Sequence, residues 1–368
     1  LPSVNILSRS IFMSKIPLKS KTDLLSMTPD DLHLALSRHF SGRGQPDYRA
    51  GQVKSWLYQG LVNHFSEMTN LPLEERKALE SAFEIDQPTP KMVQVSQDST
   101  VKHLWTLKDG ELIESVLIPT DRRLTLCISS QAGCAMACTF CATGWGGFKR
   151  QLTAGEIVGQ YRASQSWANK DGCGPITNIV FMGMGEPLAN QRSLPNSLTI
   201  LNQGYKIGAR RITVSTVGFV PGIISLAKRP EQFGLALSLH SPVSKLREEL
   251  IPLEKQFPLA DVLQAIDDFK RDKGRRVTLE YTMIRGINDD LDLVHSLGDI
   301  ALRFNAFVNL IPFNPIPQNE WTATEPERIM EFANRLKSRG VSVAVRETRG
   351  RDIDAACGQL KAHAVNNG

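Results

Sequence analysis

Three cysteines, Cys134, Cys138 and Cys141, lie within eight residues of each other in the string CISSQAGCAMACTFCATG. Their spacing is C-x3-C-x2-C, and they follow an apolar run over residues 124–128 that is typical of a buried strand. Thiolates are soft ligands that suit zinc and iron–sulfur clusters, so three of them on one loop predict a metal site. The fold must therefore hold this loop at the end of a strand, where a metal can bind.

The cysteine spacing is compatible with two kinds of metal site, a zinc ion or an iron–sulfur cluster. A structural zinc needs four ligands, and Cys127 or a histidine could supply the fourth, although the paired spacing of zinc ribbons is absent. A 4Fe-4S cluster on three cysteines keeps one iron free of protein ligands, and an open coordination position is where a metal acts on a substrate. The other cysteines, Cys127, Cys173 and Cys357, are dispersed. This dispersal argues against a secreted disulfide framework and for a reducing compartment.

Six short apolar runs, separated by stretches long enough for a helix, predict right-handed βα units in the second part of the chain. The runs cover residues 124–128, 178–182, 212–215, 234–239, 277–281 and 306–311. We therefore expect an α/β fold, a partial (βα)6 barrel over residues 121–345, with its chemistry at the carboxyl ends of the strands. Six units are too few for a complete eight-fold barrel.

The segments on either side of this core have patterns of their own. Residues 23–90 are predicted to form a small helical domain, whose first helix has an N-cap at Thr28. Residues 91–120 alternate like short antiparallel strands and predict a β extension. Residues 346–368 are predicted to be a polar C-terminal loop and tail that carries Cys357.

Residues 1–22 contain basic and serine residues but no acidic residue, a composition that occurs in organellar transit peptides. We favour the other interpretation, a flexible tail or a start assigned too far upstream, and expect a cytoplasmic protein. The uncharged stretch over residues 212–227 is interrupted by Gly218 and Pro221 and is too short to span a membrane. The net charge of +5 permits a polyanionic partner without requiring one.

Longer strings of the sequence closely resemble the RlmN and Cfr family of radical S-adenosylmethionine methyltransferases, which act on RNA adenines. The strings that carry the resemblance are LIPTDRRLTLCISSQAGCAMACTFCATG, LTAGEIVGQ, FMGMGEPLAN, RRITVSTVG, LALSLHSP, LREELIP, IPFNP and RGRDIDAACGQL, and the similarity covers roughly residues 25–362. The resemblance implies a radical S-adenosylmethionine barrel, a 4Fe-4S cluster on Cys134, Cys138 and Cys141, and an RNA-binding role for the N-terminal helical domain.

The same resemblance implies which residues bind S-adenosylmethionine. Gly185 and Glu186 match positions at the methionine end of the cofactor, where a glycine lets the backbone approach and a carboxylate accepts hydrogen bonds from an ammonium. The remaining matches are Ser215, Ser238, Leu239, His240 and Asn314. They lie at the ends of predicted strands, where ligands collect in α/β folds. Without the resemblance, the glycine run would be a tight turn and His240 a core histidine.

Roles for two dispersed cysteines follow from the resemblance as well. Cys357 matches the cysteine that one S-adenosylmethionine methylates, and a radical from a second molecule then abstracts hydrogen from this methyl group. The resulting carbon radical adds to the adenine ring and links the protein to the RNA. Cys127 matches the cysteine that resolves this adduct by forming a transient disulfide with Cys357. Glu114 matches a position that accepts a proton.

From the residues alone, these three positions have simpler interpretations. Cys127 would be a small buried apolar residue, Cys357 an incidental surface thiol, and Glu114 an acid on a strand surface. Cys173 lies in a glycine-rich loop and matches no position with a role, so we expect a free structural thiol.

We predict methylation of carbon 2 of adenosine, at adenosine 2503 in the peptidyl-transferase centre of 23S rRNA and at adenosine 37 of tRNAs. Methylation of carbon 8 is the alternative within the same class, and a zinc-stabilised RNA-binding protein is the alternative from another class. The expected partners are 23S rRNA, tRNA and an electron donor such as flavodoxin or ferredoxin, with the enzyme a monomer. An enzyme that attacks a ring carbon must also unstack its base, which favours RNA loops over duplexes.

Overall fold

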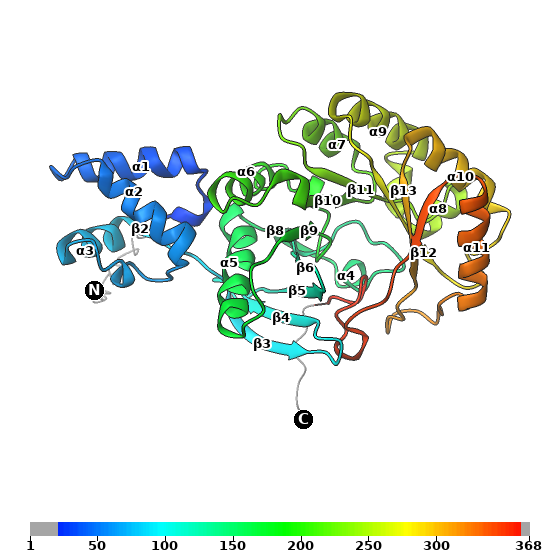
Figure 1. The fold of residues 1–368 in the computed structure, drawn as a ribbon, viewed down its shortest axis with the longest axis horizontal. Helices are drawn as coiled ribbons and strands as arrows, with labels where there is room; N and C mark the ends of the chain where they lie inside the picture. The colour runs from blue at the N-terminus through cyan, green and yellow to red at the C-terminus, as the bar shows by residue number, and fades with distance from the viewer. Residues whose placement is uncertain (1–20, 362–368) are drawn as a thin grey trace, which may run out of the picture.

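The computed structural model describes residues 21–361. The predicted tail over residues 1–22, with its possible targeting role, falls almost entirely outside the described residues, and so does the end of the C-terminal tail, residues 362–368. Figure 1 shows a group of N-terminal helices, drawn in blue, beside a larger α/β body in which helices surround a curved sheet.

The larger body is built on one sheet of ten strands. The strands are β3 (Thr89–Val95), β4 (Val101–Thr106), β5 (Leu112–Thr120), β6 (Arg123–Cys127), β9 (Asn178–Phe181), β10 (Ile212–Thr216), β11 (Gly234–Ser238), β12 (Thr278–Met283), β13 (Phe307–Pro312) and β14 (Ser342–Val345). Their order in the sheet is β14-β13-β12-β11-β10-β9-β6-β5-β4-β3. From β6 to β14 every neighbouring pair is parallel, as successive βα units require.

All six strands predicted for the barrel are present as β6 and β9 to β13. The structure adds a seventh parallel strand, β14, which pairs with β13. This strand has only four residues, and none of them is fully buried.

The predicted β extension is continuous with the barrel. Strands β3, β4 and β5 pair antiparallel, and β5 also pairs antiparallel with β6, the first barrel strand. Two short pairs stand apart from the main sheet: β1 (Thr22–Asp23) with β2 (Phe83–Glu84), and β7 (Gln131–Gly133) with β8 (Phe148–Gln151). The β7–β8 pair encloses the three-cysteine loop, so this loop is anchored at both of its ends.

Helices make up the N-terminal part and cover the barrel. They are α1 (Pro29–Ser41), α2 (Tyr48–Ser55), α3 (Leu73–Ala82), α4 (Ala142–Trp145), α5 (Ala154–Lys170), α6 (Leu194–Thr199), α7 (Val220–Ala227), α8 (Ser244–Leu250), α9 (Leu259–Lys273), α10 (Leu293–Phe304) and α11 (Pro326–Ser338). The predicted N-cap at Thr28 accepts a hydrogen bond from the Asp31 amide at 3.3 Å. At the start of α5, Thr153 and Glu156 form a capping box.

The N-terminal helices and the barrel have separate hydrophobic cores. Leu36, Phe40 and Val53 are fully buried in the smaller one. The larger core fills the space between the sheet and its covering helices, with members such as Leu237 and Phe332. Tyr58 packs against both cores, and polar contacts join the two parts as well.

A buried arginine makes these contacts. Arg162 of α5 is completely buried, and its guanidinium donates hydrogen bonds to the carbonyl oxygens of Leu57 and Val62 in the N-terminal part. It also donates to Tyr205 Oη at 3.0 Å and to Gln87 Oε1 at 3.1 Å. One side chain therefore satisfies acceptors from the N-terminal helices, the connecting segment and the barrel.

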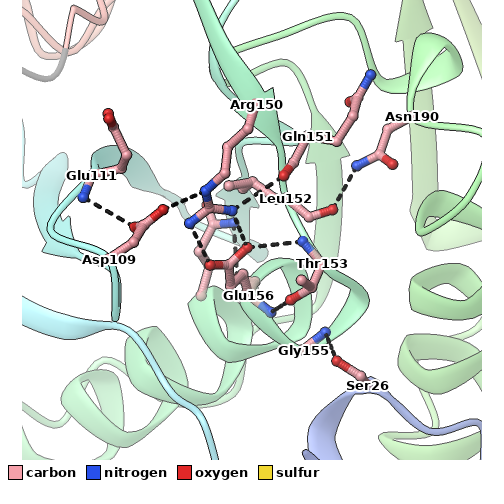
Figure 2. Close-up of polar contacts among 11 residues, drawn as sticks. Ser26, Asp109, Glu111, Arg150, Gln151, Leu152, Thr153, Gly155, Glu156 and Asn190 are labelled. Atoms are coloured by element: carbon pink, nitrogen blue, oxygen red, sulfur yellow. Dashed lines mark hydrogen bonds and ion pairs between the residues drawn. The ribbon is translucent and has the colours of Figure 1, made fainter. Parts of the chain in front are cut away.

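The start of α5 is a second junction, shown in Figure 2. The Gly155 amide donates to Ser26 Oγ of the N-terminal part at 2.9 Å. Arg150 of β8 pairs with Asp109 at 2.6 Å, in the turn between β4 and β5, and with Glu156 at 2.8 Å. The N-terminal part, the β extension and the strand after the cysteine loop are thus all fixed to one helix end.

We predict that Arg162→Met loosens the N-terminal helices from the barrel. The substitution leaves buried carbonyl and hydroxyl acceptors without a donor, which costs about 1–3 kcal/mol for each unsatisfied group. Limited proteolysis should cut the connecting segment, residues 85–88, at least about tenfold faster than in the native protein. Arg192→Met, at an exposed position, is the control and should leave the rate unchanged. Equal cleavage of both variants would contradict the role of Arg162.

Candidate active site

A pocket with an empty volume of about 980 Å³ opens at the carboxyl ends of the barrel strands. This position is that of a ligand site in an α/β barrel. Its lining includes the three clustered cysteines and most of the predicted cofactor residues, namely Cys134, Cys138, Cys141, Gly185, Glu186, Ser215, Ser238, His240, Asn314 and Cys357. The fold therefore brings together residues that are spread over more than 220 positions of the sequence.

The three clustered cysteines face this pocket from the loop between β7 and β8. A Cβ atom on Gly144 would lie 3.0 Å from backbone atoms of Cys138, so the glycine permits the tight turn after the last cysteine. Within residues 21–361, no three cysteine, histidine or acidic side chains gather around one point as a single metal ion would need. A 4Fe-4S cluster makes no such demand, because each cysteine binds a different iron. Three thiols around one pocket thus fit the cluster.

The turn after β9 forms the adjoining wall. Gly185 has a φ of 97°, and a Cβ atom there would lie 2.5 Å from the Gln131 side chain, so only glycine fits. The Glu186 carboxylate accepts hydrogen bonds from the amides of Val217 at 2.9 Å and Leu188 at 3.0 Å. Burial nevertheless raises the pKa of Glu186 to about 7. A ligand ammonium beside this carboxyl would favour its charged form.

His240 and Asn314 supply neutral polar groups to the pocket. The Thr282 amide donates to His240 Nδ1 at 3.0 Å, and burial lowers the pKa of His240 to about 3, so the ring is neutral. Asn314 Nδ2 donates to the Cys357 carbonyl at 3.1 Å, while its Oδ1 is buried and has no partner among the described residues. A bound cofactor with a hydrogen-bond donor would satisfy this oxygen. Leu239, by contrast, is buried in the core and does not line the pocket.

Cys127 and Cys357 share a second, smaller cavity beside the pocket, together with Arg346 and Met182. Cys127 is buried at the end of β6, and burial raises the pKa of its thiol to about 12. Cys357 is accessible on the side that faces the pocket but is otherwise surrounded by protein, which raises its pKa as well. The positive charge of Arg346 opposes both shifts.

Comparison with known proteins connects this geometry to a family. Residues 128–297 match the model of the radical SAM superfamily, and residues 22–85 match that of the ribosomal RNA large subunit methyltransferase N-terminal domain. The probable dual-specificity RNA methyltransferase RlmN of Gemmatimonas aurantiaca is 47% identical over 93% of this chain and 94% of the relative. That of Geobacillus kaustophilus is 40% identical over 96% and 95%. The chain belongs to the RlmN family.

A solved structure agrees with this assignment. The crystal structure of a radical SAM methyltransferase from Sphaerobacter thermophilus has a TM-score of 0.88 and 41% sequence identity, and the match covers 93% of this chain and 100% of the other. The predicted radical SAM fold is therefore confirmed, and the chain is a radical S-adenosylmethionine RNA methyltransferase. Membership in an enzyme family argues against the alternative of a zinc-stabilised binding protein. Within residues 21–361, no helix is both long and apolar enough to cross a membrane.

In this RlmN-family enzyme, the segment around Cys357 is hydrogen-bonded to the cysteine loop. The Ala142 amide donates to the Gly358 carbonyl at 2.7 Å, and Thr143 Oγ1 donates to the Leu360 carbonyl at 2.5 Å. In Figure 1 the red C-terminal segment accordingly runs close to α4. These bonds join residues more than 200 positions apart, so no local sequence pattern indicates them.

Glu114 does not line the pocket and lies behind this segment. Its Oε2 accepts a hydrogen bond from the Lys361 amide at 2.9 Å, and its Oε1 lies 3.4 Å from Lys102 Nζ. The carbonyl oxygen of Glu114 accepts a hydrogen bond from Ser129 Oγ at 2.6 Å. The carboxylate therefore anchors the end of the described chain, and its predicted role as proton acceptor stays a prediction.

Sequence reasoning missed one acidic residue of the pocket, Glu280 on β12. It is buried, and Asn309 Nδ2 donates to its Oε2 at 2.8 Å. An acid inside the apolar run of residues 277–281 was the available signal, because a charged group on a buried strand is costly without a purpose. Arg346, which follows β14, also lines the pocket.

We predict that Glu114→Gln destabilises the enzyme by about 3 kcal/mol, because it leaves the nearly buried Lys102 ammonium without its counter-charge. The double variant Lys102→Met/Glu114→Gln should recover most of this loss, as measured by urea unfolding. Measuring methylation activity in the same variants distinguishes an anchoring role of Glu114 from a proton-accepting role. An anchoring role predicts that activity returns with stability in the double variant, whereas a proton-accepting role predicts that it stays low.

Proposed function

We propose that this enzyme methylates carbon 2 of adenosine in RNA, at adenosine 2503 of 23S rRNA and adenosine 37 of tRNAs. The observation that carries the proposal is the small cavity shared by Cys127 and Cys357, beside a pocket lined by three further cysteines. Relatives that are 40–47% identical over most of the chain are named RlmN, which supports carbon 2 over carbon 8.

Residues of the pocket would hold both cofactors. Cys134, Cys138 and Cys141 would bind a 4Fe-4S cluster, and the residues that would bind S-adenosylmethionine are Gly185, Glu186, Ser215, Ser238, Leu239, His240 and Asn314. Leu239 would act only through its backbone, because its side chain is in the core. When bound, the two cofactors supply one-electron chemistry that activates the carbon of a methyl group. Two molecules of S-adenosylmethionine would be used per turnover, one as the methyl source.

The need for a cysteine follows from the substrate. Carbon 2 of adenine is electron-poor and has no lone pair to attack a sulfonium methyl group, so ordinary transfer fails there. The Cys357 sulfur is a nucleophile, and its accessible side faces the pocket. Cys357 would therefore receive the methyl group first and carry its carbon to the adenine ring. A covalent link between protein and RNA results.

Cys127 would release the product. Its thiolate attacks Sγ of Cys357, a disulfide bond forms, and the bond between Sγ and the transferred carbon breaks. The electron pair of that bond goes to the carbon, which takes up a proton and becomes the methyl group. A dithiol reductant then restores both cysteines. Arg346, which lowers the pKa of both thiols, favours the thiolate that this step needs.

The site must also admit a base from outside. Arg346, Arg349 and Arg351 line an outer pocket beside the site, where they can neutralise RNA phosphates. The target base must leave its stack to reach Cys357, so loops are better substrates than duplexes. We further propose that a flavodoxin- or ferredoxin-like protein supplies electrons and that the enzyme acts as a monomer.

Nucleoside analysis tests this proposal. Anaerobically prepared protein should contain iron and acid-labile sulfide, and with S-adenosylmethionine and a reductant it should convert adenosine in a 23S rRNA fragment to 2-methyladenosine. Mass spectrometry of the digested RNA identifies the product. Formation of 8-methyladenosine alone would overturn the carbon-2 assignment, and zinc without iron would overturn the radical chemistry.

We predict that Cys127→Ala accumulates protein covalently linked to RNA, because the adduct on Cys357 then has no resolving thiol. Denaturing gel electrophoresis with labelled RNA should show a slower band that nuclease removes. Cys173→Ala, which removes an exposed cysteine outside the pocket, is the matched control and should show no such band. Normal turnover by Cys127→Ala would disprove the resolving role.

A further inference from the structure

Two buried carboxyl groups, Glu186 and Glu280, line the pocket at different places. Glu186 interacts electrostatically with the cluster cysteines Cys134 and Cys138. Glu280 instead interacts with Cys357, the thiol that would meet the RNA. The first carboxyl group therefore lies beside the cysteine loop, whereas the second lies between Cys357 and Ser238, its neighbour on β11, where a base that reaches Cys357 would meet the bound cofactor.

Glu280 keeps one oxygen free at this position. Asn309 of β13 donates to Oε2 and fixes the carboxyl orientation, while Oε1 has no hydrogen-bond partner among residues 21–361. Glu280 is a buried residue, and it is the pocket that gives this oxygen access to a ligand. An acceptor that faces a ligand pocket can receive a hydrogen bond from a bound donor.

Arg346 helps to keep Glu280 charged. Its guanidinium lines the same pocket and makes no ion pair in the described part of the chain. Burial raises the pKa of Glu280, whereas Arg346 and the Asn309 hydrogen bond lower it. Arg346 also lines the outer pocket with Arg349 and Arg351, so it stands on the route by which a phosphate-linked base would enter.

A carboxylate in this place can distinguish purine bases. Adenine presents an exocyclic amine, which donates hydrogen bonds, where guanine presents a carbonyl oxygen, which a carboxylate repels. We propose that Glu280 is a specificity-determining residue that accepts a hydrogen bond from the exocyclic amine of the target adenine, and that Asn309 positions it. This inference rests on the proposed function, because it requires an adenine beside Cys357.

The proposal is tested with two variants and two RNAs. Glu280→Leu removes the acceptor, and Glu280→Gln retains a neutral one. One RNA stem-loop carries adenosine at the target, and the other carries purine riboside, which lacks the exocyclic amine. With adenosine, kcat/KM should fall about 10- to 100-fold in Glu280→Leu and less in Glu280→Gln, because hydrogen bonds to charged groups are the strong ones.

The decisive measurement is whether the loss of activity caused by Glu280→Leu depends on the exocyclic amine of the target base. Purine riboside should reduce the rate of the native enzyme by a similar factor but should cause no further loss in Glu280→Leu. The proposal would be overturned if Glu280→Leu reduced kcat/KM by the same factor with purine riboside as with adenosine. Weaker binding of S-adenosylmethionine by Glu280→Leu, measured by equilibrium dialysis, would also overturn it, because the carboxylate would then serve the cofactor. Glu327→Leu, at an exposed position on α11, is the matched control and should behave as the native enzyme.

The same measurements separate this proposal from the proposed function. Failure of the native enzyme to methylate either RNA would refute the proposed function itself. Methylation of the adenosine RNA without coupling at position 280 would refute only the role of Glu280. Guanosine at the target adds an independent check, since Glu280→Leu should discriminate against it less strongly than the native enzyme.

Discussion

The hydrogen bonds between the cysteine loop and the C-terminal segment are the contacts on which the site depends. The amide of Ala142 and the hydroxyl of Thr143 donate to the carbonyl oxygens of Gly358 and Leu360, which follow Cys357 in the chain. Together with the bonds from Asn314 to the Cys357 carbonyl and from the Lys361 amide to Glu114, they hold this segment over the barrel mouth. Because α4 starts directly after Cys141, this short helix contacts the segment that carries Cys357 while it holds the end of the cysteine cluster.

Burial in this site disfavours the charged forms of its acidic groups. A low-dielectric environment disfavours thiolates and carboxylates, and it raises the pKa values of Cys127, Cys357, Glu186 and Glu280. The structure compensates with one cation, Arg346, close to both thiols and to Glu280. A single charge that acts on three groups couples them, so substitution of Arg346 would raise the pKa of both thiols and of Glu280 together. Glu280 and Cys127 are therefore cleaner positions at which to test the two proposals separately.

Sequence patterns predicted the local features and missed the distant ones. The six barrel strands and the Thr28 cap each arise from neighbouring residues, whose periodicity or spacing has a direct physical meaning. No sequence pattern could predict that Arg162 joins the N-terminal part to the barrel, because its hydrogen-bond acceptors lie 43 to 105 positions away in the sequence. The location of Glu114 behind the C-terminal segment could not be predicted from the sequence either. A motif match assigns a role to a position, but only the fold shows which neighbours share that position.

The hydrogen bonds on α5 determine where the N-terminal part lies relative to the pocket. Arg162 fixes the N-terminal helices to the middle of α5, and Ser26 and Arg150 meet at its start, next to β8 and the cysteine loop. The N-terminal part is thereby held at a set position relative to the pocket. An RNA bound to both parts would have to present a loop at a matching distance from its docking site. Such an RNA would be selected by its shape, because a fixed spacing between the two parts of the protein places no demand on its sequence.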